Sequence, residues 1–134
     1  MISYVEYVYF FLNTIYIGID KGDNMLKINM EFRKGLLFVR LIGNLDEYTL
    51  EYFKKEVSDF ILENGLKYIV LNLKELKYID SKGINQLTKD FQSISNSNGQ
   101  VVICGVEEKT YKKDLKYYTY TSPNELNAFQ LIQV

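Results

Sequence analysis

The residues that could carry chemistry gather in one short segment, Asp80-Ser81-Lys82-Gly83. Ser81 has a hydroxyl that can accept a phosphoryl group. An apolar run ends just before the segment and a helical pattern follows it, so Ser81 is predicted at a helix N-cap, near solvent and beside backbone N–H groups without intrahelical partners. A phosphate there would meet the positive end of the helix dipole. The segment is therefore predicted to accept a phosphate without loss of the fold.

Other chemistries are disfavoured by the residues that the chain lacks. It has no histidine, which excludes Ser-His-Asp and Cys-His catalysis and removes the commonest metal ligand. Lys82 is a poor base for Ser81, because adjacent helix positions do not face each other. A phosphoaspartate at Asp80 would need a cluster of acidic residues to hold Mg²⁺, and Asp46 is a single contributor. We therefore expect no catalytic residue, metal or cofactor.

Two elements must position this segment. Residues 68–73 form a short β-branched apolar run, which predicts a buried strand. Ile84, Leu87, Phe91 and Ile94 recur at spacings of 3, 4 and 3, which predicts a helix over about 82–96 that ends at Asn96-Ser97-Asn98-Gly99. The connection 74–80 is predicted to join the two.

The rest of the chain predicts an α/β fold. Strands at 26–32 and 36–42 form a hairpin, and a loop at 43–49 leads into a helix that Asn64-Gly65 ends. A buried strand at 100–104, a polar segment at 107–114 (short helix or loop), an edge strand at 117–121 and a last helix starting within 122–125 follow. This order predicts a mixed sheet of an N-terminal hairpin plus parallel strands, with helices packed on it.

Composition limits the partners. The 134 residues are 47% hydrophobic, enough for one domain with a core. Sixteen basic and 17 acidic residues give a net charge of -1, and no basic stripe is present, so nucleic-acid binding is disfavoured. The single cysteine, Cys104, is predicted to be a small buried hydrophobe.

Residues 1–24 differ from the rest, being rich in Tyr, Phe, Ile and Val. Three interpretations stay open: a membrane anchor, although the apolar stretch is short; an added strand or helix on the domain; or a segment that is not translated. We favour the third, because Lys21-Gly22-Asp23-Asn24 can be encoded by the purine-rich AAA-GGA-GAT-AAT, a ribosome-binding sequence directly before Met25. The domain is then residues 25–134.

Three motifs carry a resemblance to a known family. Residues 39–46 end in Gly43-Asn44-Leu45-Asp46, which resembles a strand ending in Gly-Glu-Leu-Asp. Residues 69–83 resemble a Val-Leu-Asp-Leu…Asp-Ser-Ser-Gly segment, and residues 98–105 resemble a Gly-Gly-x-Val-x-Val strand. In this order and spacing they resemble the STAS domain family, specifically the bacterial anti-sigma factor antagonists.

The resemblance implies a switch. In that family the unphosphorylated antagonist binds an anti-sigma factor that is itself a serine kinase, which releases a sigma factor. Phosphorylation of the serine ends the binding, and a serine phosphatase resets it. Carried over to this chain, Ser81 is the phosphorylation site. The implied partner-binding residues are Asp80, Ser81, Lys82, Gly83, Asn44 and Asp46. The implied setting is the bacterial cytoplasm, without a membrane.

Two departures from the family bear on the partner. Lys82 replaces a small residue and Asn44 replaces an acidic one. An alternative function is therefore a non-phosphorylated STAS scaffold in a signalling or transporter-associated complex. Each residue also has a purely structural interpretation: Ser81 as a helix cap, Asp80 as a carboxylate bonded to nearby backbone N–H groups, Asp46 as a turn residue and Lys82 as a solvated side chain.

Overall fold

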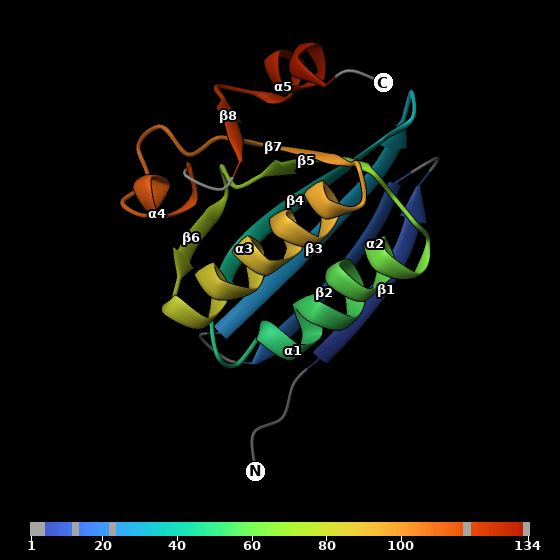
Figure 1. Ribbon diagram of the computed structural model, residues 1–134. Coiled ribbons are helices and arrows are strands. Elements are labelled where there is room, and N and C mark those ends of the chain that lie inside the picture. Colours follow the sequence, from blue (N-terminus) through green and yellow to red (C-terminus); the bar gives the residue numbers. More distant parts are fainter. Residues whose placement is uncertain (1–4, 12–13, 22–23, 117–118, 133–134) are drawn as a thin grey trace.

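The computed structural model describes residues 5–11, 14–21, 24–116 and 119–132. Four strands come first, and the helices then lie between and after the later strands, in the predicted α/β order (Figure 1). In chain order they are β1 (Val5–Phe11), β2 (Thr14–Lys21), β3 (Asn24–Arg33), β4 (Leu36–Leu45), α1 (Leu50–Phe53), the π-helical segment η1 (Lys54–Ser58), α2 (Asp59–Glu63), β5 (Tyr68–Asn72), β6 (Leu76–Ile79), α3 (Ser81–Asn96), β7 (Gln100–Cys104), α4 (Lys112–Lys116), β8 (Tyr120–Ser122) and α5 (Glu125–Leu131).

Within the described residues, the strands form one mixed sheet in the order β1-β2-β3-β4-β5-β7-β8, and β6 pairs with β4. The pairs from β1 to β4 are antiparallel, and β4, β5, β7 and β8 run parallel. The prediction of an N-terminal hairpin plus parallel strands is thus confirmed.

Helices cover both faces of the sheet. In Figure 1, α1, α2 and α3 lie over one face, where they bury a core that includes Val39, Leu71 and Ile103. The alternate residues Phe38, Val70 and Val102 form a second cluster with Ala128 of α5. Because successive strand residues point to opposite faces, α5 covers the other side of the sheet. Burial of both faces explains why the central strands are continuous apolar runs.

Two details of the structure differ from the predicted elements. The connection 74–80 contains β6, which pairs in parallel with the end of β4 (Leu45↔Ile79) across a register shift at Gly43/Asn44. Only the first and last residues of β6 are buried, so it has no period of two that would mark a strand. The helix after the 43–49 loop contains the π-helical η1, a departure that hydrophobic spacing does not reveal.

The remaining predictions agree in outline. The polar segment 107–114 leads into the short helix α4, and the predicted edge strand appears as β8. Tyr117 and Tyr118, part of that prediction, lie outside the described residues.

The N-terminal segment pairs as an antiparallel hairpin, β1 with β2, and β2 continues the sheet beside β3 (Lys21↔Asn24 to Thr14↔Glu31). This matches the added-strand interpretation of residues 1–24. Where translation starts is a property of the gene and not of this packing, so the start at Met25 stays a prediction. Over the part of the chain that the structure describes, no helix has both the length and the apolar character needed to cross a membrane.

Candidate functional site

Ser81 is the first residue of α3 and is exposed to solvent. The N-cap of this helix is Asp80, with extended backbone angles of φ -92° and ψ 179°. The prediction that Ser81 caps the helix is therefore wrong by one residue. Asp80 is the cap because its backbone is still extended and the helix begins at Ser81; its carboxylate accepts from the third helical N–H, and the Ser81 side chain stays exposed. No hydrogen bond from that hydroxyl to a described residue is present.

The Asp80 carboxylate joins two parts of the chain. Its Oδ1 accepts a hydrogen bond from the backbone N–H of Gly83 at 2.8 Å, which closes the first turn of α3. Its Oδ2 accepts one from the backbone N–H of Glu47 at 2.9 Å, which holds the loop after β4. The structural interpretation of Asp80 as an acceptor for nearby N–H groups is confirmed.

Gly83 allows α3 to approach the sheet closely. A Cβ at this position would lie 2.8 Å from the carbonyl oxygen of Leu45 and 2.7 Å from Cγ1 of Ile79. Both distances are shorter than any normal contact, so a side chain would push the helix away from β4 and β6. Gly83 is itself buried, and its lack of a side chain sets how closely the first turn of α3, which carries Ser81, lies to the sheet.

Asp46 and Asn44 shape the loop from the inside. Asp46 is only 5% exposed, and its Oδ1 accepts from the backbone N–H groups of Tyr48 at 2.9 Å and Thr49 at 3.2 Å. Asn44 is half-buried, and its carbonyl accepts a hydrogen bond from the Thr49 hydroxyl at 2.9 Å. The turn interpretation of Asp46 is confirmed, and its carboxylate faces the loop backbone and not the surface.

The surface beside Ser81 combines the predicted residue Lys82 with three residues that sequence reasoning missed, Glu47, Tyr48 and Tyr78. Glu47 pairs with Lys82 (Oε2 to Nζ, 3.4 Å), and both side chains are largely exposed. Tyr48, next to Glu47 in the loop, and Tyr78, which lines the same hollow as Ser81, are exposed large aromatic residues. The one available signal was position, since these residues directly flank Asp46 and Asp80 in the sequence. We call Glu47, Tyr48, Tyr78, Ser81 and Lys82 the Ser81 surface.

A hollow of about 420 Å³ lies next to Ser81, between β6, the first turns of α3 and the segment before α4. Tyr111 closes its floor: its hydroxyl donates to the Leu76 carbonyl at 3.0 Å, and burial raises the pKa of this tyrosine to about 12. The lining residues include Tyr78, Ser81, Ile84, Asn85, Thr110 and Asp114. The hydroxyl of Ser81 is thus reachable from a concave surface.

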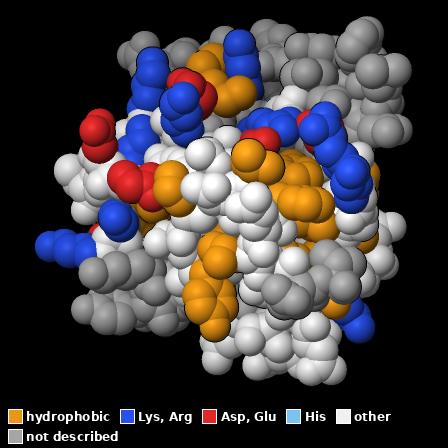
Figure 2. Space-filling model, turned by 90° about the horizontal axis from the view of Figure 1, so that it is seen from above, with side chains coloured by type: hydrophobic (Ala, Val, Ile, Leu, Met, Phe, Trp, Pro, Cys, Tyr) orange, Lys and Arg blue, Asp and Glu red, His pale blue; other side chains and the backbone are white. Residues whose placement is uncertain are grey.

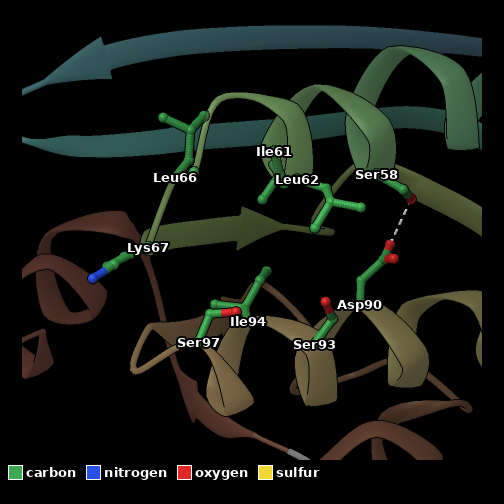
Figure 3. Close-up of a pocket in the computed structure, with 10 residues that line it drawn as sticks. Ser58, Ile61, Leu62, Leu66, Lys67, Asp90, Ser93, Ile94 and Ser97 are labelled. Atoms are coloured by element: carbon green, nitrogen blue, oxygen red, sulfur yellow. Dashed lines mark hydrogen bonds between the residues drawn. The ribbon is translucent and has the colours of Figure 1, made fainter.

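A second, smaller cavity of about 90 Å³ lies between α2 and α3 and is separate from Ser81 (Figure 3). At one end Asp90 accepts hydrogen bonds from Ser58 at 2.7 Å and from Gln86 at 2.9 Å. Burial raises the pKa of Asp90, although these hydrogen bonds oppose the shift. Asp90 lies nine positions after Ser81, about two and a half helical turns, so this cavity does not belong to the Ser81 site.

The chemical group that this site presents to other molecules is the hydroxyl of Ser81. Ser81 has no hydrogen-bonded base among the described residues, and in the same part of the chain no group of three or more Cys, Asp or Glu residues is placed to hold a metal ion. The arrangement offers an exposed nucleophilic oxygen at a helix N-terminus, framed by aromatic and charged side chains. It suits modification and recognition by another protein.

Comparison with known proteins gives one family. The family model described as STAS domain matches residues 27–118. An anti-sigma F factor antagonist from Paenibacillus polymyxa is 30% identical over 113 residues, which cover 81% of this chain and 97% of the relative.

Two solved structures have the same fold. The anti-sigma factor antagonist SpoIIAA in its unphosphorylated form has a TM-score of 0.65 at 17% identity, covering 78% of this chain and 99% of its own. The Bacillus cell fate determinant SpoIIAA in its phosphorylated form has a TM-score of 0.60 at 18% identity, covering 79% of this chain and 99% of its own. At this identity the two structures support the fold alone.

Proposed function

Because this chain belongs to the STAS domain family, with an anti-sigma F factor antagonist among its relatives, we propose that it binds an anti-sigma factor in its unphosphorylated form and that phosphorylation of Ser81 ends the binding. Such antagonists are regulatory binding proteins and not enzymes. The partner that we propose is an anti-sigma factor with serine kinase activity, with a serine phosphatase to restore the hydroxyl. The proposed location is the cytoplasm.

The observation that carries the proposal is the exposed, unbonded hydroxyl of Ser81 at the first position of a 16-residue helix. Phosphorylation adds about -1.5 to -2 charges at neutral pH. The N–H groups at the start of α3 and the helix dipole favour that charge within the fold. In an interface the same charge would be desolvated and would repel facing carboxylates, so binding changes while folding survives. SpoIIAA, a structural neighbour, has been solved in both unphosphorylated and phosphorylated forms.

The predicted binding residues divide into two groups under this proposal. Ser81 and Lys82 are exposed and would contact the partner, together with Glu47, Tyr48 and Tyr78 of the Ser81 surface. Aromatic residues at the centre of an interface often carry much of the binding energy. The other predicted residues would act indirectly, by holding the Ser81 surface in place: Asp80, Gly83, Asn44 and Asp46.

The extent of the domain is also a proposal. We infer that residues 25–134 form the STAS domain and that residues 1–24 precede the translated start. The family model begins at residue 27, and the Paenibacillus relative is covered almost completely by four fifths of this chain, which supports a domain without the N-terminal hairpin.

The experiment is a pull-down from the native cell with unphosphorylated protein, followed by addition of ATP and intact-mass analysis. We expect a kinase-like anti-sigma factor and one added phosphate, mapped to Ser81. Ser81→Ala should bind without being modified, and Ser81→Asp should weaken binding at least about tenfold, or 1.4 kcal/mol. Ser95→Asp, an exposed serine later on the same helix, is the matched control and should bind normally.

Equal affinity of wild type and Ser81→Asp for the captured partner would contradict the switch and support the alternative of a constitutive scaffold. The mass of the protein isolated from the native cell also decides the start, because a mass that includes Met1 contradicts translation from Met25.

A further inference from the structure

A second exposed hollow lies at the end of the sheet opposite to Ser81. It has a volume of about 250 Å³ and lies between α5 and the turn that joins β3 to β4. Its lining consists of Arg33, Lys34, Phe38, Glu125, Leu126 and Phe129. The turn precedes the first residue of β4, whereas β6 and Ser81 follow its last residues. Ten strand residues separate the two ends, about 30 Å.

Apolar surface is left uncovered here because α5 is short. This helix has seven residues, and Ala128 faces the sheet with Ile132 just beyond the helix end. Leu126 on its outer side is 66% exposed, and Leu131 is also exposed. Leu126 and the half-buried Phe129 line the hollow over the buried Phe38, so the exposed leucine belongs to a continuous apolar lining and is not an isolated one of the kind that any surface carries.

The hollow is held in shape by an ion pair under α5. Arg40 on β4 donates two hydrogen bonds to Glu125, from Nε at 2.7 Å and from a terminal nitrogen at 2.8 Å. Asn72 donates a third to Glu125 at 2.8 Å. This fixes the first turn of α5 against the sheet. A preformed surface binds with less loss of conformational entropy than one that must order on contact.

The rim of the hollow is positively charged. Lys34 is exposed at the tip of the turn and forms no ion pair with a described residue, and Arg33 is exposed and pairs with Glu31 at 2.6 Å. Glu125 is the one acidic side chain among the described lining residues, and Arg40 already neutralises it. Figure 2 shows this face, where hydrophobic side chains gather in the middle and Lys and Arg side chains lie beside them.

We propose that this hollow is a docking surface for an acidic amphipathic segment of a partner protein. Apolar side chains of that segment would pack against Leu126 and Phe129, over the buried Phe38, and its carboxylates would pair with Lys34. Because the surface lies at the other end of β4 from Ser81, its occupation is independent of the phosphorylation state. The protein would thus hold two partners, or two parts of one partner, at once.

The test uses a synthetic helical peptide with leucines at helical spacing and glutamates elsewhere, and a second peptide with lysines in place of the glutamates. Binding to the full chain is measured by fluorescence anisotropy and mapped by NMR chemical-shift changes. We expect the acidic peptide to bind, with shifts around Lys34 and Leu126, and the basic peptide to bind at least about tenfold more weakly.

Matched variants locate the contact. Leu126→Glu and Lys34→Glu should each weaken the acidic peptide about tenfold or more. Leu62→Glu on α2 changes a leucine that is 68% exposed, and Lys89→Glu changes an exposed lysine on α3, so neither should affect binding. Ser81→Asp should also leave the peptide affinity unchanged, which separates this surface from the proposed phosphorylation switch. Thermal unfolding of each variant shows whether the fold is retained.

Several results would overturn the proposal. These are no binding of the acidic peptide at millimolar concentration, equal binding of both peptides, or equal effects of Leu126→Glu and Leu62→Glu. Self-association that Leu126→Glu abolishes would show that a second copy covers the surface. Binding to phosphatidylserine vesicles but not to the peptide would replace the protein partner with an anionic membrane.

Discussion

Asp80→Ala is the change that tests the architecture of the Ser81 site most directly. The carboxylate caps α3 through Gly83 and holds the loop through Glu47. Loss of an N-cap costs about 1 kcal/mol. A hydrogen bond to a charged group contributes roughly 1.5–3 kcal/mol, and the lower end applies here because the Glu47 bond is exposed to water. We therefore expect Asp80→Ala to lower the free energy of unfolding by about 2–3 kcal/mol.

Equilibrium urea unfolding measures this loss. With a slope of about 1–3 kcal/mol per molar urea, the midpoint should fall by about 0.7–3 M while the slope is unchanged. Two controls separate the contributions. Asn124→Ala removes the N-cap of α5, which makes one side-chain bond, to the N–H of Asn127 at 2.9 Å; it should cost about 1 kcal/mol. Ser81→Ala removes an unbonded exposed hydroxyl and should stay within about 0.5 kcal/mol of wild type.

Two outcomes would refute the reasoning. If Asp80→Ala costs no more than Asn124→Ala, the bond to the Glu47 N–H does not stabilise the fold. If Ser81→Ala costs as much as Asp80→Ala, Ser81 contributes the cap and its hydroxyl is not free for modification.

Two further predictions concern α3. Gly83→Ala places a Cβ against the Leu45 carbonyl oxygen at 2.8 Å, so the strain of about 1–3 kcal/mol should exceed the gain in helix propensity of about 1 kcal/mol. Thermal unfolding should show a loss of stability that the control variant Asn85→Ala, at an exposed position, does not show. Equal stability of the two variants would contradict the close contact. Burial raises the pKa of Asp90 above its ordinary value of 3.8, so its ionisation destabilises the folded state as the pH rises past that value. Asp90→Asn should therefore have a higher free energy of unfolding than wild type at neutral pH, and the difference should disappear as the pH falls toward 3.8. Urea unfolding at several pH values measures this difference, and a difference that does not change with pH would show that the ionisation of Asp90 does not destabilise the folded state.

Local sequence patterns predicted most helices and strands, because the spacing of apolar residues within each segment indicates whether it is a helix or a strand. The spacing of Leu87, Phe91 and Ile94 specified α3, and all three are buried. β6 was missed because its pairing depends on the shifted end of β4 and not on its own sequence. The predicted cap, Ser81, and the observed cap, Asp80, differ by one residue, because the sequence pattern does not fix the residue at which the backbone becomes helical.

Contacts between distant residues could not be read from the sequence. Arg40 and Glu125 are 85 positions apart, and nothing in their local sequence links them. The same is true of Glu47 and Lys82, whose pairing depends on how the loop after β4 lies against α3. Asp46 matched the family motif, yet its carboxylate bonds the loop backbone, so motif position alone does not separate a contact residue from a supporting one.

The structure also bears on how the proposed switch would act. One carboxylate, Asp80, ties both the loop and the helix start, so the Ser81 surface is held in place before any partner arrives. Phosphorylation then need not rearrange the fold to stop binding. A negative charge at the helix start is favourable by about 0.3–1 kcal/mol, so the fold would tolerate the phosphate. The surface beside Ser81 carries the Glu47–Lys82 ion pair, whose two charges cancel. Phosphorylation of Ser81 would therefore give this locally neutral surface a net negative charge, and that change in charge, without a change of fold, is what would end the binding.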